Sequence, residues 1–280
     1  MIFSTLNNDI KLEILVSTMN KTSLSFLESM FPYHKLENLN ILIINQTDIG
    51  NKLVSSYNNI RIINSYIKGL SKSRNLAIEN AIGDVCLIAD DDVEYSSNFE
   101  NIIVSAFEKL QEASIIRFRI DTFSGEVYKT YPKTSKRLFK KKEIENTSSI
   151  EIAFKRKDII ENKITFNTFF GLGSSFPSGE EYLFLKDTLR KGLQIYFQNT
   201  VIVKHKLESS TSNSNIASND FIKTQAALYY HNYKELSYLY LFKFIIFLLR
   251  KQLISINDFI RKYNVGISAI KAYKKLRNAK

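Results

Sequence analysis

The amino-acid sequence predicts an α/β fold, with a doubly wound and mostly parallel sheet and a helical, basic C-terminal extension. Apolar runs typical of buried strands alternate with segments of helical periodicity from Leu12 to Ile120, and this alternation predicts a parallel sheet. One of these runs, Val85 to Ala89, ends abruptly in three aspartates. The net charge of +11 is concentrated near the C-terminal end. We therefore expect a sheet domain that carries the functional site at 1–219 and a helical extension at 220–280.

Four apolar runs predict the parallel strands, and polar or turn-forming residues bound each of them. The runs are 12–16, 39–44, 60–63 and 85–89. Helices are expected between them at 24–31 and 71–82, where apolar residues recur at helical spacing, and Ser71 is placed as an N-cap. A third helix follows the strand at 85–89. It has the capping-box spacing Ser97-Asn98-Phe99-Glu100 and one long apolar face.

The second part of the predicted domain combines further strands with a long polar segment. Ile116, Phe118 and Ile120 alternate with arginines, which predicts a strand with one polar face. Residues 122–142 are polar and basic, and we expect a long loop or hairpin there. Strand patterns follow at 149–154, 195–197 and 201–203, and apolar residues at helical spacing predict a helix at 182–189.

The three consecutive aspartates at the end of the fourth predicted strand point most directly to chemistry. Three like charges repel one another, and burying them unpaired is costly. A divalent cation with a phosphate ligand resolves that conflict, because Mg2+ and Mn2+ prefer hard oxygen ligands. In a doubly wound sheet, ligands bind beyond the carboxyl ends of the strands, where Asp90, Asp91 and Asp92 fall. A solvated turn is the alternative interpretation of the same residues.

The composition limits the class of protein. A hydrophobic content of 44% and an aromatic content of 12% indicate a globular chain rather than a disordered one. The single cysteine, Cys86, excludes an internal disulfide and fits a reducing compartment, and we interpret it as a small buried hydrophobe. Residues 1–9 contain neither a basic nor an apolar signal region, so we expect no signal peptide.

Four short segments occur in the order known from one enzyme family. They are Ile14 to Asn20, the run Gly69-Leu70-Ser71-Lys72-Ser73-Arg74-Asn75, the run Ala89-Asp90-Asp91-Asp92, and Ser178-Gly179-Glu180-Glu181 with His205 downstream. On these segments the chain resembles the family 2 glycosyltransferases, which have the GT-A fold, a Rossmann-like nucleotide-binding architecture. Each motif occurs by chance elsewhere, so the ordered set carries the resemblance.

The resemblance implies a donor site and a metal site beyond the strand ends. Asp90 and Asp92 correspond to the two ends of the family's D-x-D motif, and the resemblance implies that both help bind the divalent cation, Asp92 as a direct ligand and Asp90 near the donor ribose or a metal-bound water. His205 matches a histidine that helps bind the metal or the diphosphate. The cofactor implied is Mn2+ or Mg2+, which would neutralise the charge on the leaving nucleoside diphosphate. Donor contacts are implied for Thr18, Asn20, Asp48, Lys72, Arg74, Asp90 and Asp91.

The Glu180-Glu181 pair aligns with an acidic motif of the family whose second residue commonly serves as the base. An inverting transfer needs a carboxylate to accept the proton of the acceptor hydroxyl while its oxygen attacks the anomeric carbon. The resemblance therefore implies Glu181 as general base, with Glu180 in reserve. Ser178 and Glu181 also have the capping-box spacing, so a helix-capping role for Glu181 is the competing interpretation. For Lys72 and Arg74 the competing interpretation is an ordinary solvated helix start.

The chain departs from the family in two places. Relatives usually end the second strand with an aspartate pair, one of which meets uracil, whereas this strand ends in Asn45-Gln46-Thr47-Asp48. The first loop, Ser17-Thr18-Met19-Asn20, lacks the common proline and tyrosine. A UDP-sugar is the expected donor, but these departures leave the nucleotide base open.

The C-terminal extension places an apolar segment in basic surroundings. Residues 236–249 are apolar nearly all round, with Lys243 inside, and are shorter than the roughly 20 residues needed to cross a bilayer. Residues 221–280 hold 12 Lys and Arg against Glu235 and Asp258, a net charge of +10. This combination predicts either an interfacial helix on an anionic leaflet or a helix that docks on the catalytic domain.

Together these features predict an inverting, metal-dependent glycosyltransferase. It would move a sugar from a nucleotide-diphosphate sugar to a saccharide or lipid-linked saccharide, in bacterial surface polysaccharide synthesis. We expect it in the cytoplasm, peripherally on the inner face of the membrane. A non-catalytic nucleotide-sugar-binding module of the same fold is one alternative. A basic nucleic-acid-binding protein is the other, but the positive charge lies beside an apolar segment, so we expect no nucleic acid as partner.

Overall fold

The computed structural model describes residues 10–206 and 216–279, which divide into two compact units. The first unit contains residues 10–166 and 181–206, and the second contains residues 167–180 and 216–279. The second unit therefore combines an internal segment with the C-terminal part of the chain.

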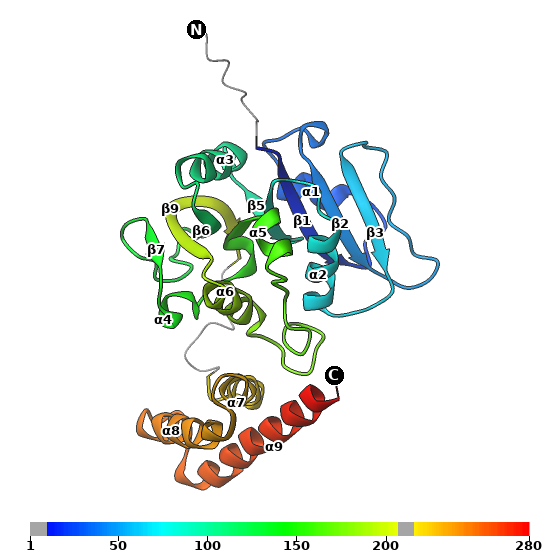
Figure 1. The fold of residues 1–280 in the computed structure, drawn as a ribbon. Helices are drawn as coiled ribbons and strands as arrows, with labels where there is room; N and C mark the ends of the chain where they lie inside the picture. The colour runs from blue at the N-terminus through cyan, green and yellow to red at the C-terminus, as the bar shows by residue number, and fades with distance from the viewer. Residues whose placement is uncertain (1–9, 207–215, 280) are drawn as a thin grey trace. The chain divides into compact units, whose positions relative to one another are not determined.

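One mixed sheet runs through the first unit, with the strand order β3-β2-β1-β4-β8-β6-β9-β5 and with β7 paired to β9 (Figure 1). β1 pairs in parallel with β2 and β4, and β2 pairs in parallel with β3. The expected α/β class with a largely parallel sheet is confirmed. The strands are β1 Leu12–Met19, β2 Ile41–Gln46, β3 Ile60–Ser65, β4 Val85–Asp90, β5 Glu94–Tyr95, β6 Ala113–Thr122, β7 Lys136–Leu138, β8 Ile152–Lys155 and β9 Gln194–His205.

Separate apolar clusters cover the two faces of the sheet, because successive side chains of a strand point to opposite faces. Ile14 and Val16 of β1 belong to one cluster, and Leu15 between them belongs to the other. Helices α1 and α3 contribute to the first cluster, and α2 and α6 contribute to the second. The helices of this unit are α1 Ser25–Met30, α2 Leu70–Asn80, α3 Phe99–Lys109, α4 Lys141–Ile144, α5 Arg156–Glu161 and α6 Glu180–Arg190, with the 3-10 turns η1 Leu36–Asn38 and η2 Ser149–Glu151.

The carboxyl ends of β1, β2 and β4 lie side by side. Ser17 of β1 is opposite Asp90 of β4, and Thr18 is opposite Asn45 of β2. Because parallel strands end at the same edge of a sheet, the aspartates that follow β4 lie next to the loop that follows β1. This edge is where the sequence predicts the functional site.

The strand predicted at 149–154 starts later than expected and runs in the reverse direction. Ser149–Glu151 form the turn η2, and only Ile152–Lys155 form β8, which pairs antiparallel with both β4 and β6. Leu87 is opposite Ala153, so the start of β8 approaches the carboxyl end of β4. Hydrophobic alternation carries no information on strand direction, and the sequence pattern therefore could not reveal this reversal.

Other boundaries also differ from the sequence-based expectation. Gly69, not Ser71, is the N-cap of α2, because the chain enters this helix with a φ of 126° that glycine adopts most easily. Asn98, not Ser97, is the N-cap of α3. The strands predicted at 195–197 and 201–203 form the single strand β9. It pairs in parallel with β6, and the register of this pairing shifts along the strand.

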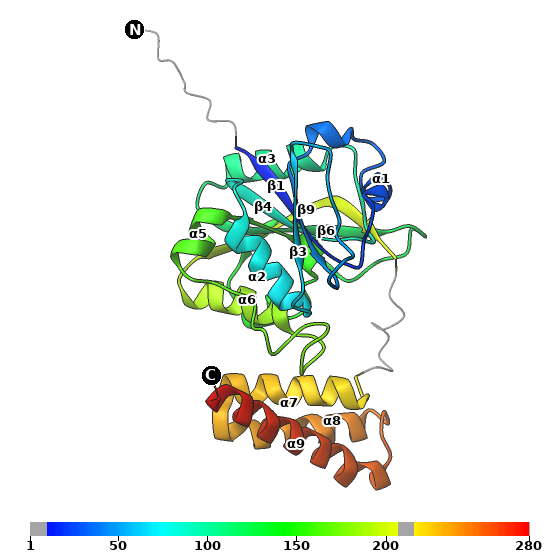
Figure 2. The ribbon, with the colours of Figure 1, turned by 90° about the vertical axis from the view of Figure 1, so that its right-hand side faces the viewer.

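The second unit is built from three helices that pack against one another (Figure 2). Tyr273 is only 1% exposed at their centre, and its hydroxyl hydrogen-bonds Nδ1 of His231 at 2.7 Å. The rings of Phe170 and Phe176, from the internal segment, lie 5.4 and 5.7 Å from that of Tyr273. Over the described part of the chain, none of the helices is both long and apolar enough to cross a membrane. The helices are α7 Asn219–Tyr233, α8 Ser237–Arg250 and α9 Phe259–Asn278, with the turns η5 Lys234–Leu236 and η6 Ile256–Asp258.

Candidate active site

The three consecutive aspartates occupy three different environments. Asp91 accepts a short hydrogen bond from the hydroxyl of Thr18, and its Oδ2 lies 3.0 Å from Nζ of Lys21. Both partners come from the end of β1 and the loop after it, as the strand register requires. Asp91 is therefore held against the first loop, while the carboxylates on either side of it are left to other partners.

Asp90 is bound by a buried arginine and a serine. Arg74 is 2% exposed, and its Nη2 lies 3.1 Å from Oδ1 of Asp90 and 2.7 Å from Oγ of Ser149. The Ser149 hydroxyl in turn donates to Oδ2 of Asp90 at 3.0 Å. A guanidinium this well buried requires partners, and Asp90 and Ser149 supply them.

The same arginine also binds Glu181, the expected general base. Nη1 of Arg74 lies 3.1 Å from Oε1 of Glu181, and the guanidinium lies over the ring of Phe166 at 5.6 Å. Arg74 thus joins a carboxylate at the end of β4 to a carboxylate in the first turn of α6. The Arg74 side chain, which the sequence assigns to the donor, is turned towards these two acids. A guanidinium between two carboxylates binds both and fixes their orientation.

The geometry at the start of α6 bears on the competing capping interpretation. A capping box formed by Ser178 and Glu181 needs the helix to begin directly after Ser178. The helix instead begins at Glu180, after Gly179 with a φ of 101°. The Glu181 carboxylate forms an ion pair with Arg74. Glu180, the reserve candidate for the base, is only 3% exposed.

Asp92 is the most exposed of the three aspartates, and it faces the predicted histidine. Its side chain is 65% exposed, and Oδ1 lies 3.4 Å from Nε2 of His205 at the end of β9. Hydrogen bonding from His205 holds the pKa of Asp92 below its ordinary value. The His205 ring is itself only 7% exposed and packs edge-on against Tyr128 at 5.9 Å.

The described residues contain no group of three or more His, Cys, Asp or Glu side chains placed to hold a metal ion. Asp92 and His205 offer one oxygen and one nitrogen donor, which suits two positions on Mn2+ or Mg2+. Asp90 is already bound by Arg74 and Ser149. The protein therefore supplies only part of a ligand set for a metal ion. Water or phosphate oxygens would fill the remaining coordination positions.

The other predicted donor contacts lie nearer the surface. Asn20 has a φ of 55°, and its N–H donates to the carbonyl of Gln46 at 2.9 Å, which fixes the turn after β1. Asp48 is 66% exposed and lies 3.3 Å from Nζ of Lys68. Lys72 is exposed on the first turn of α2. These residues are not drawn into the cluster around Arg74.

The end of β2, where relatives usually carry an aspartate pair, holds a ladder of amide groups. Asn45 Nδ2 donates to Oδ1 of Asn64 at 3.0 Å and to the carbonyl of Lys21 at 3.0 Å. Gln46 Oε1 accepts from the N–H of Gly69 at 2.7 Å, before α2. An amide both donates and accepts, so these side chains fasten the neighbouring loops without the charge of an aspartate.

A second buried charge cluster, which sequence reasoning missed, lies beside the turn η2. Glu151 is fully buried, and its Oε2 lies 2.8 Å from Nη2 of Arg117, while Oε1 pairs with Nζ of Lys129. Burial lowers the pKa of Lys129, and the Glu151 carboxylate opposes that shift. The spacing Ser148-x-x-Glu151 fits a capping box, and the structure forms one there. That spacing was the available signal for Glu151, whereas the pairing of Ser149 with Asp90 has no local signature.

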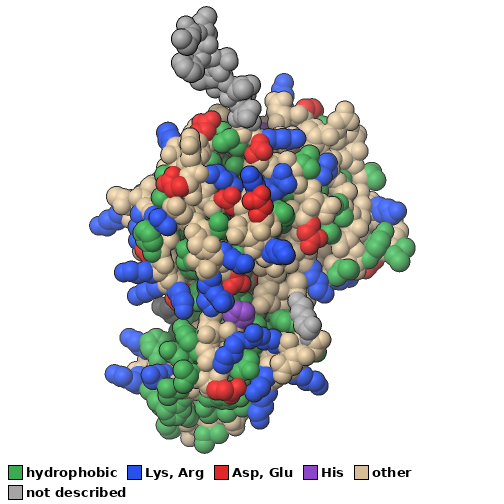
Figure 3. Space-filling model, in the orientation of Figure 1, with side chains coloured by type: hydrophobic (Ala, Val, Ile, Leu, Met, Phe, Trp, Pro, Cys, Tyr) green, Lys and Arg blue, Asp and Glu red, His purple; other side chains and the backbone are tan. Residues whose placement is uncertain are grey.

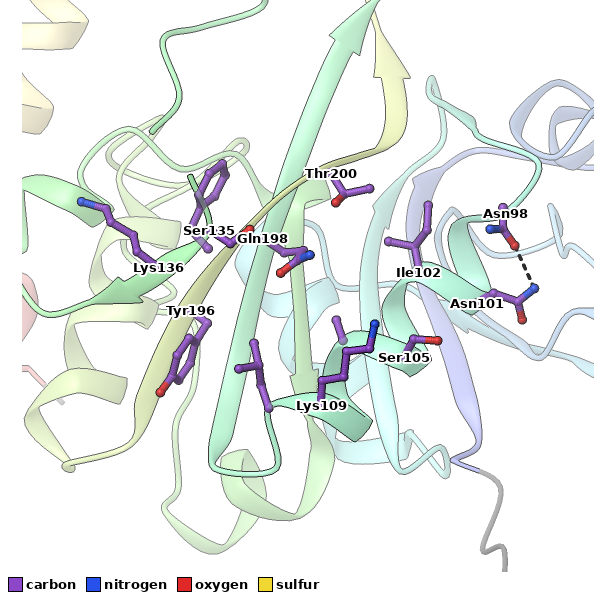
Figure 4. A pocket seen from close by; sticks show the side chains of 13 residues that line it. Asn98, Asn101, Ile102, Ser105, Lys109, Ser135, Lys136, Tyr196, Gln198 and Thr200 are labelled. Atoms are coloured by element: carbon purple, nitrogen blue, oxygen red, sulfur yellow. Dashed lines mark hydrogen bonds between the residues drawn. The ribbon is translucent and has the colours of Figure 1, made fainter. Parts of the chain in front are cut away.

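A pocket of about 500 Å³ lies elsewhere on the first unit, between α3 and β9 (Figure 4). Asn98, directly before α3, and Asn101 and Lys109 of α3 line it on one side, and Tyr196 and Gln198 of β9 line it on the other. Asn101 donates to Asn98 at 2.8 Å. None of the predicted site residues lines this pocket.

Comparison with known proteins agrees with the fold. A crystal structure of S. aureus TarS residues 1–349 is 14% identical with a TM-score of 0.56, over 93% of this chain and 81% of that one. The same protein in complex with UDP-GlcNAc matches with the same TM-score and identity, over 93% and 82%. A longer TarS structure matches with 15% identity and a TM-score of 0.55, over 94% of this chain and 50% of that one. The curated proteins gave no match. The model of the family Glycosyl transferase family 2 matches residues 17–177, more than half of the chain, and the chain therefore belongs to this family.

Proposed function

We propose that this chain is an inverting glycosyltransferase that uses a nucleotide-diphosphate sugar, most simply a UDP-sugar, as donor. The observation that carries the proposal is the link made by Arg74 between Asp90 and Glu181. The position of the Glu181 carboxylate, linked through Arg74 to the carboxyl end of β4, supports a role as base, because ligands bind beyond the carboxyl ends of the strands in such folds. The TarS complexes with UDP-GlcNAc and with UDP support the donor class, because they share this fold.

In this proposal Glu181 accepts the proton of the acceptor hydroxyl. The hydroxyl oxygen forms a bond to the anomeric carbon as the bond from that carbon to the diphosphate oxygen breaks, and the diphosphate leaves with the electron pair. The ion pair with Arg74 limits the rotation of Glu181 before the acceptor arrives. Asp90, held by Arg74 and Ser149, remains an acceptor for donor hydroxyls.

We also propose that Asp92 and His205 hold a divalent cation, Mn2+ or Mg2+, together with the donor diphosphate. Bound there, the ion would neutralise the charge that develops on the leaving nucleoside diphosphate. The support is the adjacency of one oxygen and one nitrogen donor at the open end of the sheet. The acceptor in this proposal is a saccharide or lipid-linked saccharide of a bacterial surface polysaccharide, extended by the enzyme at the inner face of the membrane.

The proposal is tested by screening UDP-, GDP- and TDP-sugars for release of the nucleoside diphosphate, with and without Mn2+. We expect one UDP-sugar to be hydrolysed, and we expect Asp92→Asn to remove the stimulation by Mn2+. Asp187→Asn, which changes a partly exposed carboxylate of α6, is the matched control and should behave like the wild type. A chain that binds and hydrolyses none of these donors would not be an active glycosyltransferase. Equal donor affinity with and without Mn2+, measured by calorimetry, would remove the metal from the proposal.

A further inference from the structure

Helix α8 of the second unit exposes an apolar face, although Tyr240 and Phe242 also contact rings of the unit: Tyr233 at 4.2 Å, and Phe259 and Tyr263 at 5.9 Å each. Leu236, just before the helix, is 61% exposed, and Leu239, Phe242 and Phe247 are 48%, 42% and 43% exposed. With Tyr240, at 37%, and the cations Lys243 and Arg250, these residues form what we name the α8 outer face. Figure 3 shows hydrophobic side chains gathered over this part of the second unit, with basic side chains at their margin.

The opposite face of α8 is fully buried within the unit. Leu241, Ile245 and Leu248 have no exposed surface, and α8 packs against α7 and α9. A Cβ atom placed on Gly266 of α9 would lie 2.5 Å from Cδ1 of Leu241, so the two helices approach closely. This packing fixes the rotation of α8. The packing of the unit therefore keeps the outer face turned outward.

The charge along this face has one sign. Between residues 236 and 257 the chain carries Lys243, Arg250 and Lys251 and no Asp or Glu. Lys243 and Arg250 are seven residues apart, which puts them on one side of the helix, amid the exposed apolar side chains. A partner for this face needs an apolar interior and a negatively charged boundary.

We propose that the α8 outer face docks on the surface of an anionic lipid bilayer. The helix is 14 residues long, about 21 Å at 1.5 Å per residue, so it fits lying in the membrane plane rather than across it. The Leu and Phe side chains enter the acyl boundary, and the flexible stems of Lys243 and Arg250 reach the lipid phosphates. The inference rests on the membrane location in the proposed function and names the residues responsible for it, and its test is independent of the transfer reaction.

A second copy of the chain is the main competing occupant, and the charges disfavour it. A two-fold interface would bring the same patch of both copies together, so that Lys243 and Arg250 of each copy approach those of the other. Like charges brought together in an interface cost free energy. Lipid phosphates are negatively charged, so they attract Lys243 and Arg250 instead of repelling them.

The test measures binding of the full chain to vesicles by sedimentation. Vesicles of equal parts phosphatidylglycerol and phosphatidylcholine are compared with pure phosphatidylcholine vesicles. We expect binding to the anionic vesicles that weakens in high salt, because screening reduces the charged part of the attraction. The double variant Lys243→Gln/Arg250→Gln should bind about 30-fold more weakly, since each basic residue near such a surface contributes about 1 kcal/mol.

Two further variants separate this face from general basicity and from dimerisation. Lys271→Gln/Arg277→Gln removes two exposed cations of α9 and should leave the affinity within about threefold of the wild type. Leu239→Ser/Phe247→Ser changes only exposed side chains, so it should fold normally by circular dichroism yet lose at least about tenfold in affinity. Equal losses in the α8 and α9 charge variants would overturn the proposal, as would no binding to anionic vesicles at low salt. A dimer in ultracentrifugation that Leu239→Ser/Phe247→Ser dissolves would overturn it in favour of self-association.

Discussion

The two units of this protein use their side chains in opposite ways. In the first unit charged groups turn inward and satisfy one another, as Arg74 does with Asp90 and Glu181. In the second unit the centre is aromatic, around Tyr273, and the exposed α8 outer face is apolar. A buried charge cluster costs desolvation and adds little stability, so its position at the strand ends indicates chemistry. An exposed apolar face indicates a partner.

The largest effect is expected at Glu181, the proposed general base among the inward-facing charges of the first unit. Glu181→Gln keeps the size of the side chain and removes its basicity, so transfer should slow by roughly 10²–10⁴-fold with donor affinity preserved. Initial rates at saturating donor measure this. Glu79→Gln, an exposed position on α2, is the control. If Glu180→Gln slows the reaction and Glu181→Gln does not, the base is the other member of the pair.

The next largest effect tests whether the inward-facing charges of the first unit depend on one another. Glu151→Gln leaves Arg117 and Lys129 buried without their shared carboxylate, and the free energy of unfolding should fall by about 3–5 kcal/mol. Urea denaturation measures the change. Glu145→Gln, exposed and nearby, should have almost no effect. If Glu151→Gln is as stable as that control, the cluster does not hold the turn η2 in place.

A smaller effect is expected where α8 and α9 meet in the second unit. Gly266→Ala adds a methyl group that would lie 2.5 Å from Leu241, at an overpacking cost of about 1–3 kcal/mol, partly offset by the better helix propensity of alanine, about 1 kcal/mol. Thermal unfolding measures the net loss. In the double variant with Leu241→Ala, the clash disappears, so the two changes should be non-additive. Strict additivity would show that the helices do not approach this closely.

The smallest effect is expected at Cys86, which lies in the apolar interior of β4. Burial raises the pKa of this thiol, and the side chain has no exposed surface. The folded chain should therefore not react with iodoacetamide even near pH 8.5, where a free cysteine is half ionised. Mass spectrometry should detect modification only after unfolding in denaturant. Rapid labelling of the native chain would mean that β4 opens locally.

Much of this architecture could be predicted from the sequence, because strands and helices have different periods. The runs at 12–16 and 85–89 were recognised as strands, and the helix that carries Phe99 was recognised by its apolar face. The reversed direction of β8 could not be predicted, since the alternation of Ile152 and Phe154 is the same in either direction. Cap positions were wrong at Ser71 and Ser97, where neighbouring residues compete for the same role.

The candidate site was predicted in its residues but not in its connections. Asp90, Glu181 and Arg74 were all named from short motifs, yet Arg74 and Glu181 are separated by 107 positions and their contact leaves no local pattern. The pairing of Ser149 with Asp90 spans 59 positions, and nothing near Ser149 indicates it. Sequence motifs identify the type of side chain that a reaction needs. Contacts between distant segments depend on tertiary packing and appear only in the structure.

The reversed strand β8 has a consequence for how this enzyme can diversify. Because β8 runs against its neighbours, the residue that reaches Asp90 stands at the end of the connection from β6 rather than at the start of a loop leaving the sheet. That connection runs from residue 123 to 148 and has only a short strand and a short helix of its own. Insertions that leave β7 and Lys129 in place can therefore reshape the surroundings of Asp90 while the strand registers are kept.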